Sequence, residues 1–160
     1  DKVEKSYRVL RRLDELFRDA VSRMVPVADL PALFDGLKSR GVSIGIASSD
    51  GAAAVADTVR HFGLIGLVDF ISGYDSGHGY KPEAGMFTAF CAACRLQPSE
   101  VAMVGDNLHD MEMGRRGGAG WRVGVLTGTG TRQTLAHASD MVLDSIAVLE
   151  QALFGPRLSG

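Results

Sequence analysis

The sequence is poor in several kinds of residue, and each scarcity excludes a class of protein. It has two cysteines in 160 residues, too few for a disulfide framework, which favours a cytoplasmic setting. No apolar run approaches the length of a membrane span, so we expect no membrane-spanning segment. The net charge is only −2, and no run of lysine and arginine indicates a nucleic-acid surface. We therefore expect neither a membrane nor a nucleic acid as partner.

Apolar residues are plentiful, at 46% of the chain, which is enough for one domain with a sizeable core. Short apolar runs typical of buried strands alternate with segments of helical spacing. This alternation predicts an α/β fold, a three-layer Rossmann-like parallel sheet with helices on both faces. The predicted strands cover residues 42–47, 68–72, 101–104, 121–126 and 140–143.

Helical segments are indicated by apolar residues three and four positions apart and by residues suited to helix starts. Residues 2–24 have this spacing throughout and predict an amphipathic helix. Later helices are predicted to begin at residues that cap or open a first turn. These residues are Asp29, Lys81-Pro82, Asp110, Thr131 and Ser145.

The most informative stretch is Val101–Asp110, in which an apolar run leads into Gly105 and Asp106 and then reaches Asp110. Asp106 is predicted to lie just past the carboxyl end of a strand, where open α/β sheets bind ligands. Mg²⁺ is commonly held by one or two carboxylates together with phosphate oxygens. The stretch taken alone fits equally well a loop cap at Asp106 and a helix cap at Asp110.

Other polar residues are predicted to reach the same edge, because right-handed crossovers bring the carboxyl ends of parallel strands together. Ser48, with Ser49 beside it, offers a hydroxyl next to backbone N–H groups at a helix start, which suits a phosphate oxygen. Lys81 offers a compact positive charge. Asp110 can orient either the waters of a metal or the ammonium of Lys81. The predicted site with Asp106 is a positive, metal-bearing pocket for a phosphoryl group.

Three motifs resemble those of the haloacid dehalogenase superfamily, most closely its phosphoglycolate-phosphatase-like branch, over roughly residues 26–150. Ser48 closing VSIGIAS resembles the second family motif, Lys81 in YKPEAGMF the third, and VAMVGDNLHD the fourth. The resemblance implies a Mg²⁺-dependent phosphatase of a small phosphorylated metabolite. It implies that Ser48 and Lys81 hold the phosphoryl group, that Asp106 binds Mg²⁺, and that Asp110 supports Lys81 or the metal shell.

The first family motif, Asp-x-Asp after the first strand, has no counterpart in the 160 residues. In the family its first aspartate is the nucleophile, which becomes an aspartyl phosphate, and its second is the general acid/base. The resemblance places that strand centrally, between the strands that precede Ser48 and Asp106. We therefore expect the central strand to be missing. Residues 1–24 are expected to be the last helix of a helical cap, residues 25–154 the core and residues 155–160 a tail.

The missing strand leads to a hypothesis about the whole protein. A sheet without its central strand leaves a row of backbone groups unpaired. We expect an N-terminal segment or another chain to complete the sheet, and residues 1–160 alone to be inactive. Direct pairing of residues 42–47 with residues 101–104 in a closed sheet would contradict this hypothesis.

Several alternatives stay open. The chain could be a non-catalytic relative that binds phosphate, a metal or a protein, or a dehalogenase or phosphonatase-like hydrolase on the same scaffold. Cys91 and Cys94 lie in a helical run and are interpreted as core packing. Gly128-Thr129-Gly130 lacks the third glycine of a dinucleotide fingerprint and is interpreted as a turn. The four histidines show no metal-binding spacing.

Overall fold

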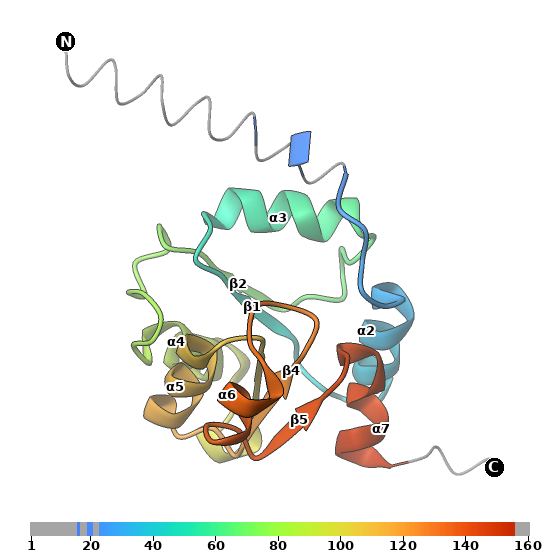
Figure 1. Ribbon diagram of the computed structural model, residues 1–160. Helices are drawn as coiled ribbons and strands as arrows, with labels where there is room; N and C mark the ends of the chain where they lie inside the picture. Colours follow the sequence, from blue (N-terminus) through green and yellow to red (C-terminus); the bar gives the residue numbers. More distant parts are fainter. Residues whose placement is uncertain (1–15, 17–18, 21–22, 156–160) are drawn as a thin grey trace.

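The structure is a computed structural model that describes Leu16, Asp19, Ala20 and residues 23–155 (Figure 1). The predicted helix over residues 2–24 lies largely outside this part, although Leu16, Asp19 and Ala20 are helical. The predicted cap helix and tail therefore stay predictions. Within the described part, no helix combines the length and the apolar character needed to cross a bilayer.

The described strands form two separate parallel sheets. In the first, β1 (Gly45–Ala47) pairs with β2 (Phe70–Ser72). In the second, β3 (Ala102–Gly105), β4 (Trp121–Val125) and β5 (Met141–Leu143) lie in that order. Parallel pairing, with a helix in most of the connections, confirms the predicted α/β class.

Helices follow the strands in chain order and cover both faces of the sheets. Their positions match the segments of helical spacing, and two short 3₁₀ helices precede β3 and the last helix. The elements are α2 (Leu30–Ser39), α3 (Ala52–His61), α4 (Gly85–Cys94), η1 (Pro98–Glu100), α5 (Leu108–Gly117), α6 (Arg132–Ala136), η2 (Ile146–Val148) and α7 (Leu149–Phe154).

Three predicted helix starts are confirmed by hydrogen bonds. Side-chain oxygens of Asp29, Thr131 and Ser145 each accept a bond from a backbone N–H in the first turn that follows. Two predicted starts are wrong. Asn107 rather than Asp110 caps α5, since the Asn107 side chain accepts a bond from the Asp110 N–H at 3.1 Å. Lys81-Pro82 lies in a separate turn, closed by the Glu83 N–H on the Tyr80 carbonyl at 2.8 Å, and α4 begins only at Gly85.

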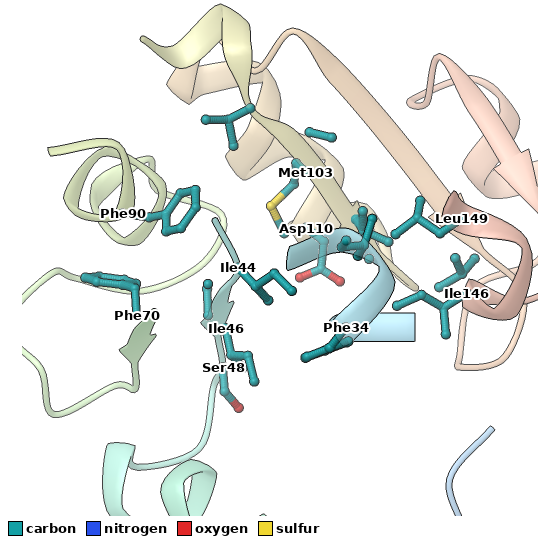
Figure 2. Close-up of a pocket in the computed structure, with 18 of the residues that line it drawn as sticks. Phe34, Ile44, Ile46, Ser48, Phe70, Phe90, Met103, Asp110, Ile146 and Leu149 are labelled. Carbon is teal, nitrogen blue, oxygen red and sulfur yellow. The ribbon is translucent and has the colours of Figure 1, made fainter. Parts of the chain in front are cut away.

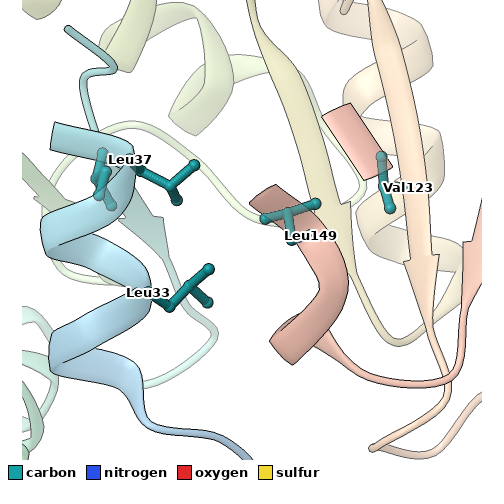
Figure 3. Close-up of a cluster of buried hydrophobic side chains, with 5 residues drawn as sticks. Leu33, Leu37, Val123 and Leu149 are labelled. Atoms are coloured by element: carbon teal, nitrogen blue, oxygen red, sulfur yellow. The ribbon is translucent and has the colours of Figure 1, made fainter. Parts of the chain in front are cut away.

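Buried apolar side chains hold helices to each face. On one face α2 packs beside α7, and Leu33, Leu37, Leu149 and Val123 form a cluster (Figure 3). On the other face α4 packs beside α5. Its cluster consists of Met86, Phe87, Cys91, Val101 and Met113. Each sheet is therefore covered by apolar helix faces on both sides, as in other parallel sheets.

The two sheets do not join. Within residues 23–155, β1 has β2 as its only strand neighbour, and β3 pairs only with β4. The direct pairing that would have contradicted the missing-strand hypothesis is therefore not seen. The strands along the gap are also poorly buried for a parallel sheet: Gly45 in β1 is exposed and all of β3 is half-buried, whereas Val123 in β4 has no exposed surface.

Candidate functional site

Four of the predicted site residues line a single cavity of about 1010 Å³, and the hydrogen-bonded residues Lys81, Asp110 and Asp106 mark its polar end. Ser48 follows β1, Asp106 follows β3, and both line the cavity together with Lys81 and Asp110. Ser49 is exposed and does not line it. The topology thus brings four of the five predicted residues to one cavity from three separate segments of the chain, as expected where strand ends meet at one edge.

Lys81 and Asp110 form a buried ion pair. The Lys81 Nζ lies 2.7 Å from Asp110 Oδ1, and the two side chains are only 13% and 4% exposed. Charges so far removed from water are retained in proteins when they are paired. The pair holds the end of a surface loop against the first turn of α5 and fixes an ammonium beside the cavity.

Asp110 also contacts the strand end that carries Asp106. Its second oxygen, Oδ2, accepts a hydrogen bond from the Asp106 N–H at 3.2 Å. A Cβ atom on Gly105 would lie 2.4 Å from that oxygen, so only glycine allows the carboxylate to come this close. Both oxygens of Asp110 are therefore engaged by protein groups. Of the two roles considered from the sequence, this arrangement fits support of Lys81 better than direct metal binding.

Asp106 has one engaged and one open carboxylate oxygen. Oδ2 accepts a bond from the Thr129 N–H at 2.9 Å and a longer one from the Thr129 hydroxyl at 3.4 Å. Within the described residues, Oδ1 has no hydrogen-bond partner. Sequence reasoning missed the contribution of Thr129, although a Gly-Thr-Gly turn directly after a strand was a visible signal.

The oxygen atoms at this end of the cavity suit a hard cation that is held by few protein ligands. Within residues 23–155, no group of three or more histidine, cysteine or acidic side chains could enclose a metal. One carboxylate with an open oxygen is compatible with Mg²⁺, which keeps several waters and relies on one or two carboxylates and on substrate phosphates. The geometry does not fit a zinc site, which needs three or four closely placed ligands.

Ser48 is held in a polar turn. Its hydroxyl donates to Asp50 Oδ2 at 3.2 Å and accepts a bond from the Asp50 N–H at 3.1 Å. The first turn of α3 is capped from another segment, because Asp75 reaches from the next loop and accepts a bond from the Ala52 N–H at 2.9 Å. The Ser48 hydroxyl can donate to a ligand oxygen only when its O–H rotates away from Asp50.

The loop that leads to Lys81 is anchored beneath the site. The hydroxyl of the fully buried Ser72 lies 2.8 Å from Nδ1 of His78, and the His78 ring stacks on Phe70.

Cys91 is a core residue as predicted, and burial raises the pKa of its thiol. No redox or metal role is indicated for it.

Away from these polar residues, the cavity continues between the two sheets as an apolar slot. Figure 2 shows Ile44, just before β1, and Ile46 of β1 facing it from one side, and Met103 and Leu149 lying across it. Interior voids larger than a water molecule are few in folded domains, so a gap of this size is not ordinary core packing. Apolar side chains from the helix layers on both faces of the sheets form its walls.

The backbone along the slot has no partner strand. Along a parallel strand, successive residues turn their N–H and C=O groups to opposite neighbours. The Ser48 N–H donates to the Ser72 carbonyl at 2.9 Å, so Ser48 faces β2, and Gly45 and Ala47 face the slot. By the same alternation Ala102 and Val104 of β3 face the slot, since Val101 is bonded towards β4.

Comparison with known proteins gives consistent matches. The sequence model of a family described as haloacid dehalogenase-like hydrolase matches residues 3–118. A protein named "Probable phosphatase IndB", from Dickeya dadantii, is 27% identical over 137 residues, 84% of this chain and 59% of that protein. The matches span between 38% and 59% of the length of these curated relatives.

Solved structures share the fold. A HAD family hydrolase from Deinococcus radiodurans, solved with bound phosphate and sodium, superposes with a TM-score of 0.76 at 22% identity. The match covers 90% of this chain and 66% of that one. β-Phosphoglucomutase from Clostridium difficile gives 0.78 at 18% identity over 94% and 65%. At such identities the likeness establishes the architecture and not the activity.

Proposed function

Because this chain belongs to the haloacid dehalogenase-like hydrolase family, we propose that it carries most of the active site of a Mg²⁺-dependent phosphatase for a small phosphorylated metabolite. One observation carries the proposal. A buried ammonium, Lys81, held by Asp110, lines the same cavity as Asp106 and Ser48. Phosphoryl transfer needs mainly positioning and charge neutralisation, and these residues offer both.

Each residue has a distinct task in this proposal. Lys81 balances the charge of the phosphoryl oxygens, and its remaining N–H groups orient them. Ser48 turns its hydroxyl from Asp50 to a phosphoryl oxygen. Asp110 keeps Lys81 charged and in place, and Asp106 offers Oδ1 to the cation. When bound, Mg²⁺ would neutralise further charge on the phosphoryl group.

The nucleophile is proposed to come from outside the 160 residues. Asp106 and Asp110 have other tasks in this proposal, and no Asp-x-Asp follows a strand in the sequence. The slot between β1 and β3 supports a specific source, a strand inserted between them. In parallel orientation, its carboxyl end reaches the polar end of the cavity, where an aspartate can attack the phosphorus as the bond from phosphorus to the substrate's alcohol oxygen breaks. The alcohol leaves with a proton from water, and water then hydrolyses the aspartyl phosphate to free phosphate and the aspartate.

The slot also constrains that strand chemically. Its backbone must pair with Gly45 and Ala47 on one side and with Ala102 and Val104 on the other. Both of its faces lie against apolar helix layers, so its side chains must be apolar in a nearly continuous run. The strand comes from an N-terminal segment of the same protein or from another chain.

We also propose a division of the chain into cap helix, core and tail, and a cellular setting. Residues 1–24 form the last helix of a helical cap that helps to select the substrate, residues 25–154 form the core and residues 155–160 form a tail. A cytoplasmic setting agrees with the low cysteine content.

Phosphate release from a panel of sugar and acid phosphates tests the proposed activity, using the protein as isolated from its own cells, with and without Mg²⁺. We expect turnover that requires Mg²⁺ and falls at least about a hundredfold in Asp106→Asn, since a metal ligand is lost. Asp144→Asn, in an exposed ion pair with Arg132, is the matched control and should retain full activity. Release of halide from 2-haloacids without phosphate release would favour the dehalogenase alternative.

Amide hydrogen exchange tests the strand directly. The Gly45, Ala47, Ala102 and Val104 amides should exchange slowly in the natural protein and quickly in residues 1–160 alone. The Ser48 and Leu126 amides are matched controls, because each donates to a neighbouring strand at 2.9 and 3.0 Å and should be slow in both samples. Equal exchange of the four test amides in both samples would exclude an inserted strand.

A further inference from the structure

The turn between β4 and α6, Thr127–Gly130, folds back onto the end of β3. The Gly130 N–H donates to the Asp106 carbonyl at 2.8 Å. The preceding N–H, that of Thr129, donates to Asp106 Oδ2 at 2.9 Å, and the Thr129 hydroxyl adds a contact at 3.4 Å. Two successive backbone N–H groups thus hold both the main chain and the side chain of one aspartate.

Glycines permit this close approach. A Cβ atom on Gly128 would lie 1.8 Å from Asp106 Oδ2, and one on Gly130 would lie 2.3 Å from the Asp106 carbonyl oxygen. Neither glycine has a positive φ, so neither is required by its backbone conformation. The side chain that would be displaced by a methyl group at position 128 is that of Asp106, since its atoms are the three nearest.

We propose that this turn is a positioning element that makes Asp106 a one-oxygen ligand and so sets the choice of cation. Thr129 holds Oδ2 on the side of the turn, and Oδ1 is the oxygen without a partner in residues 23–155. Mg²⁺ accepts such single-oxygen carboxylates in a small octahedral shell, whereas Ca²⁺ gathers six to eight oxygens and often takes both oxygens of a carboxylate. The turn therefore favours Mg²⁺ over Ca²⁺. This inference rests on the proposed function for the presence of a cation at Asp106.

Cation affinities, measured by calorimetry on the protein as isolated from its own cells, test the proposal without using activity. The unaltered protein should bind Mg²⁺ at least about tenfold more tightly than Ca²⁺. Gly128→Ala, which displaces the Asp106 carboxylate, should weaken Mg²⁺ binding by about ten- to a hundredfold, the usual effect of losing an outer partner of a metal ligand. The Mg²⁺ preference should shrink as well, because Oδ2 is released.

The matched control is Gly51→Ala, where the new Cβ meets only ordinary contacts, the nearest at 3.4 Å, and both affinities should stay within about twofold. Circular dichroism checks that each variant is folded. If Gly128→Ala does not fold, Thr129→Pro removes the same N–H group and should shift the affinities in the same direction.

The possible results separate this proposal from the proposed function. A folded Gly128→Ala protein with unchanged affinities for both cations would overturn the positioning role and leave the phosphatase proposal intact. Equal or tighter binding of Ca²⁺ by the unaltered protein would also overturn it. Binding of neither cation by the unaltered protein would overturn the metal part of the proposed function together with this inference.

Discussion

Lys81 Nζ lies 2.7 Å from Asp110 Oδ1 at the polar end of the cavity, and both side chains are nearly withdrawn from solvent. Removing one member of such a pair leaves the other charge buried without a partner. We expect Asp110→Ala to lower the free energy of unfolding by about 3 kcal/mol, because the Lys81 ammonium and the Asp106 N–H both lose their acceptor. Urea denaturation monitored by circular dichroism measures this change.

The exposed pair Arg132–Asp144 provides the control for that experiment. Its side chains are 57% and 88% exposed, and such pairs contribute between about 0 and 1 kcal/mol. Asp144→Ala should therefore leave the free energy of unfolding almost unchanged. Equal effects of Asp110→Ala and Asp144→Ala would mean that the buried pair does not stabilise the fold.

Asp69 links α2 to the start of β1 and makes stability depend on pH. Burial acts to raise the pKa of Asp69, but hydrogen bonds from Lys38 and from the Ile44 N–H, with the Lys38 charge, lower it below the ordinary 3.8. A carboxyl with a lowered folded-state pKa stabilises the protein fully above its unfolded pKa, and this contribution is lost as pH falls through the folded value.

We therefore expect Asp69→Ala to lower the free energy of unfolding by about 2 kcal/mol at pH 7, the usual order for hydrogen bonds to a charged group. The cost should shrink steadily as pH falls below 3.8, the ordinary value. Chemical denaturation at several pH values follows the difference, and Lys38→Met should remove part of the same pH dependence. A difference that stays constant down to the acid transition of the protein would be inconsistent with the proposed linkage.

The two cysteines should differ in reactivity. Burial raises the pKa of the Cys91 thiol, and the side chain packs in the core beneath α4, whereas Cys94 is partly exposed. Alkylation of the native protein at neutral pH should modify Cys94 first, because the thiolate is the reactive form and must also be accessible. Mass spectrometry of timed samples gives the order, and in urea both should react. Faster modification of Cys91 in the native protein would show that the α4 core opens.

Local patterns predicted the fold well. The apolar runs indicated each strand, and Asp29, Thr131 and Ser145 marked true helix starts, because these signals lie within a few residues of the element they define. The rule that parallel strands share one carboxyl edge was sufficient to bring Ser48 and Asp106 to one cavity.

Contacts between distant segments could not be predicted in this way. Asp75 caps α3 from a separate loop, and Thr129 holds Asp106 across the second sheet. Ile44 was expected inside β1, but its N–H bonds the side chain of Asp69, so the regular strand begins one residue later. Each of these partners is chosen by the tertiary fold. The neighbouring sequence marks Thr129 as part of a glycine turn, but it does not show which residue Thr129, Asp75 or Asp69 contacts.

The most direct test of the account compares phosphate release by residues 1–160 alone with release by the protein isolated from its own cells, both with Mg²⁺ and a generic aryl phosphate. The account predicts turnover by the natural protein and none by residues 1–160 alone, because the slot between β1 and β3 then lacks the strand that carries the nucleophile. Equal turnover by the two samples would contradict this prediction. If turnover by residues 1–160 alone were also lost in Asp106→Asn, the whole reaction would belong to the residues described above.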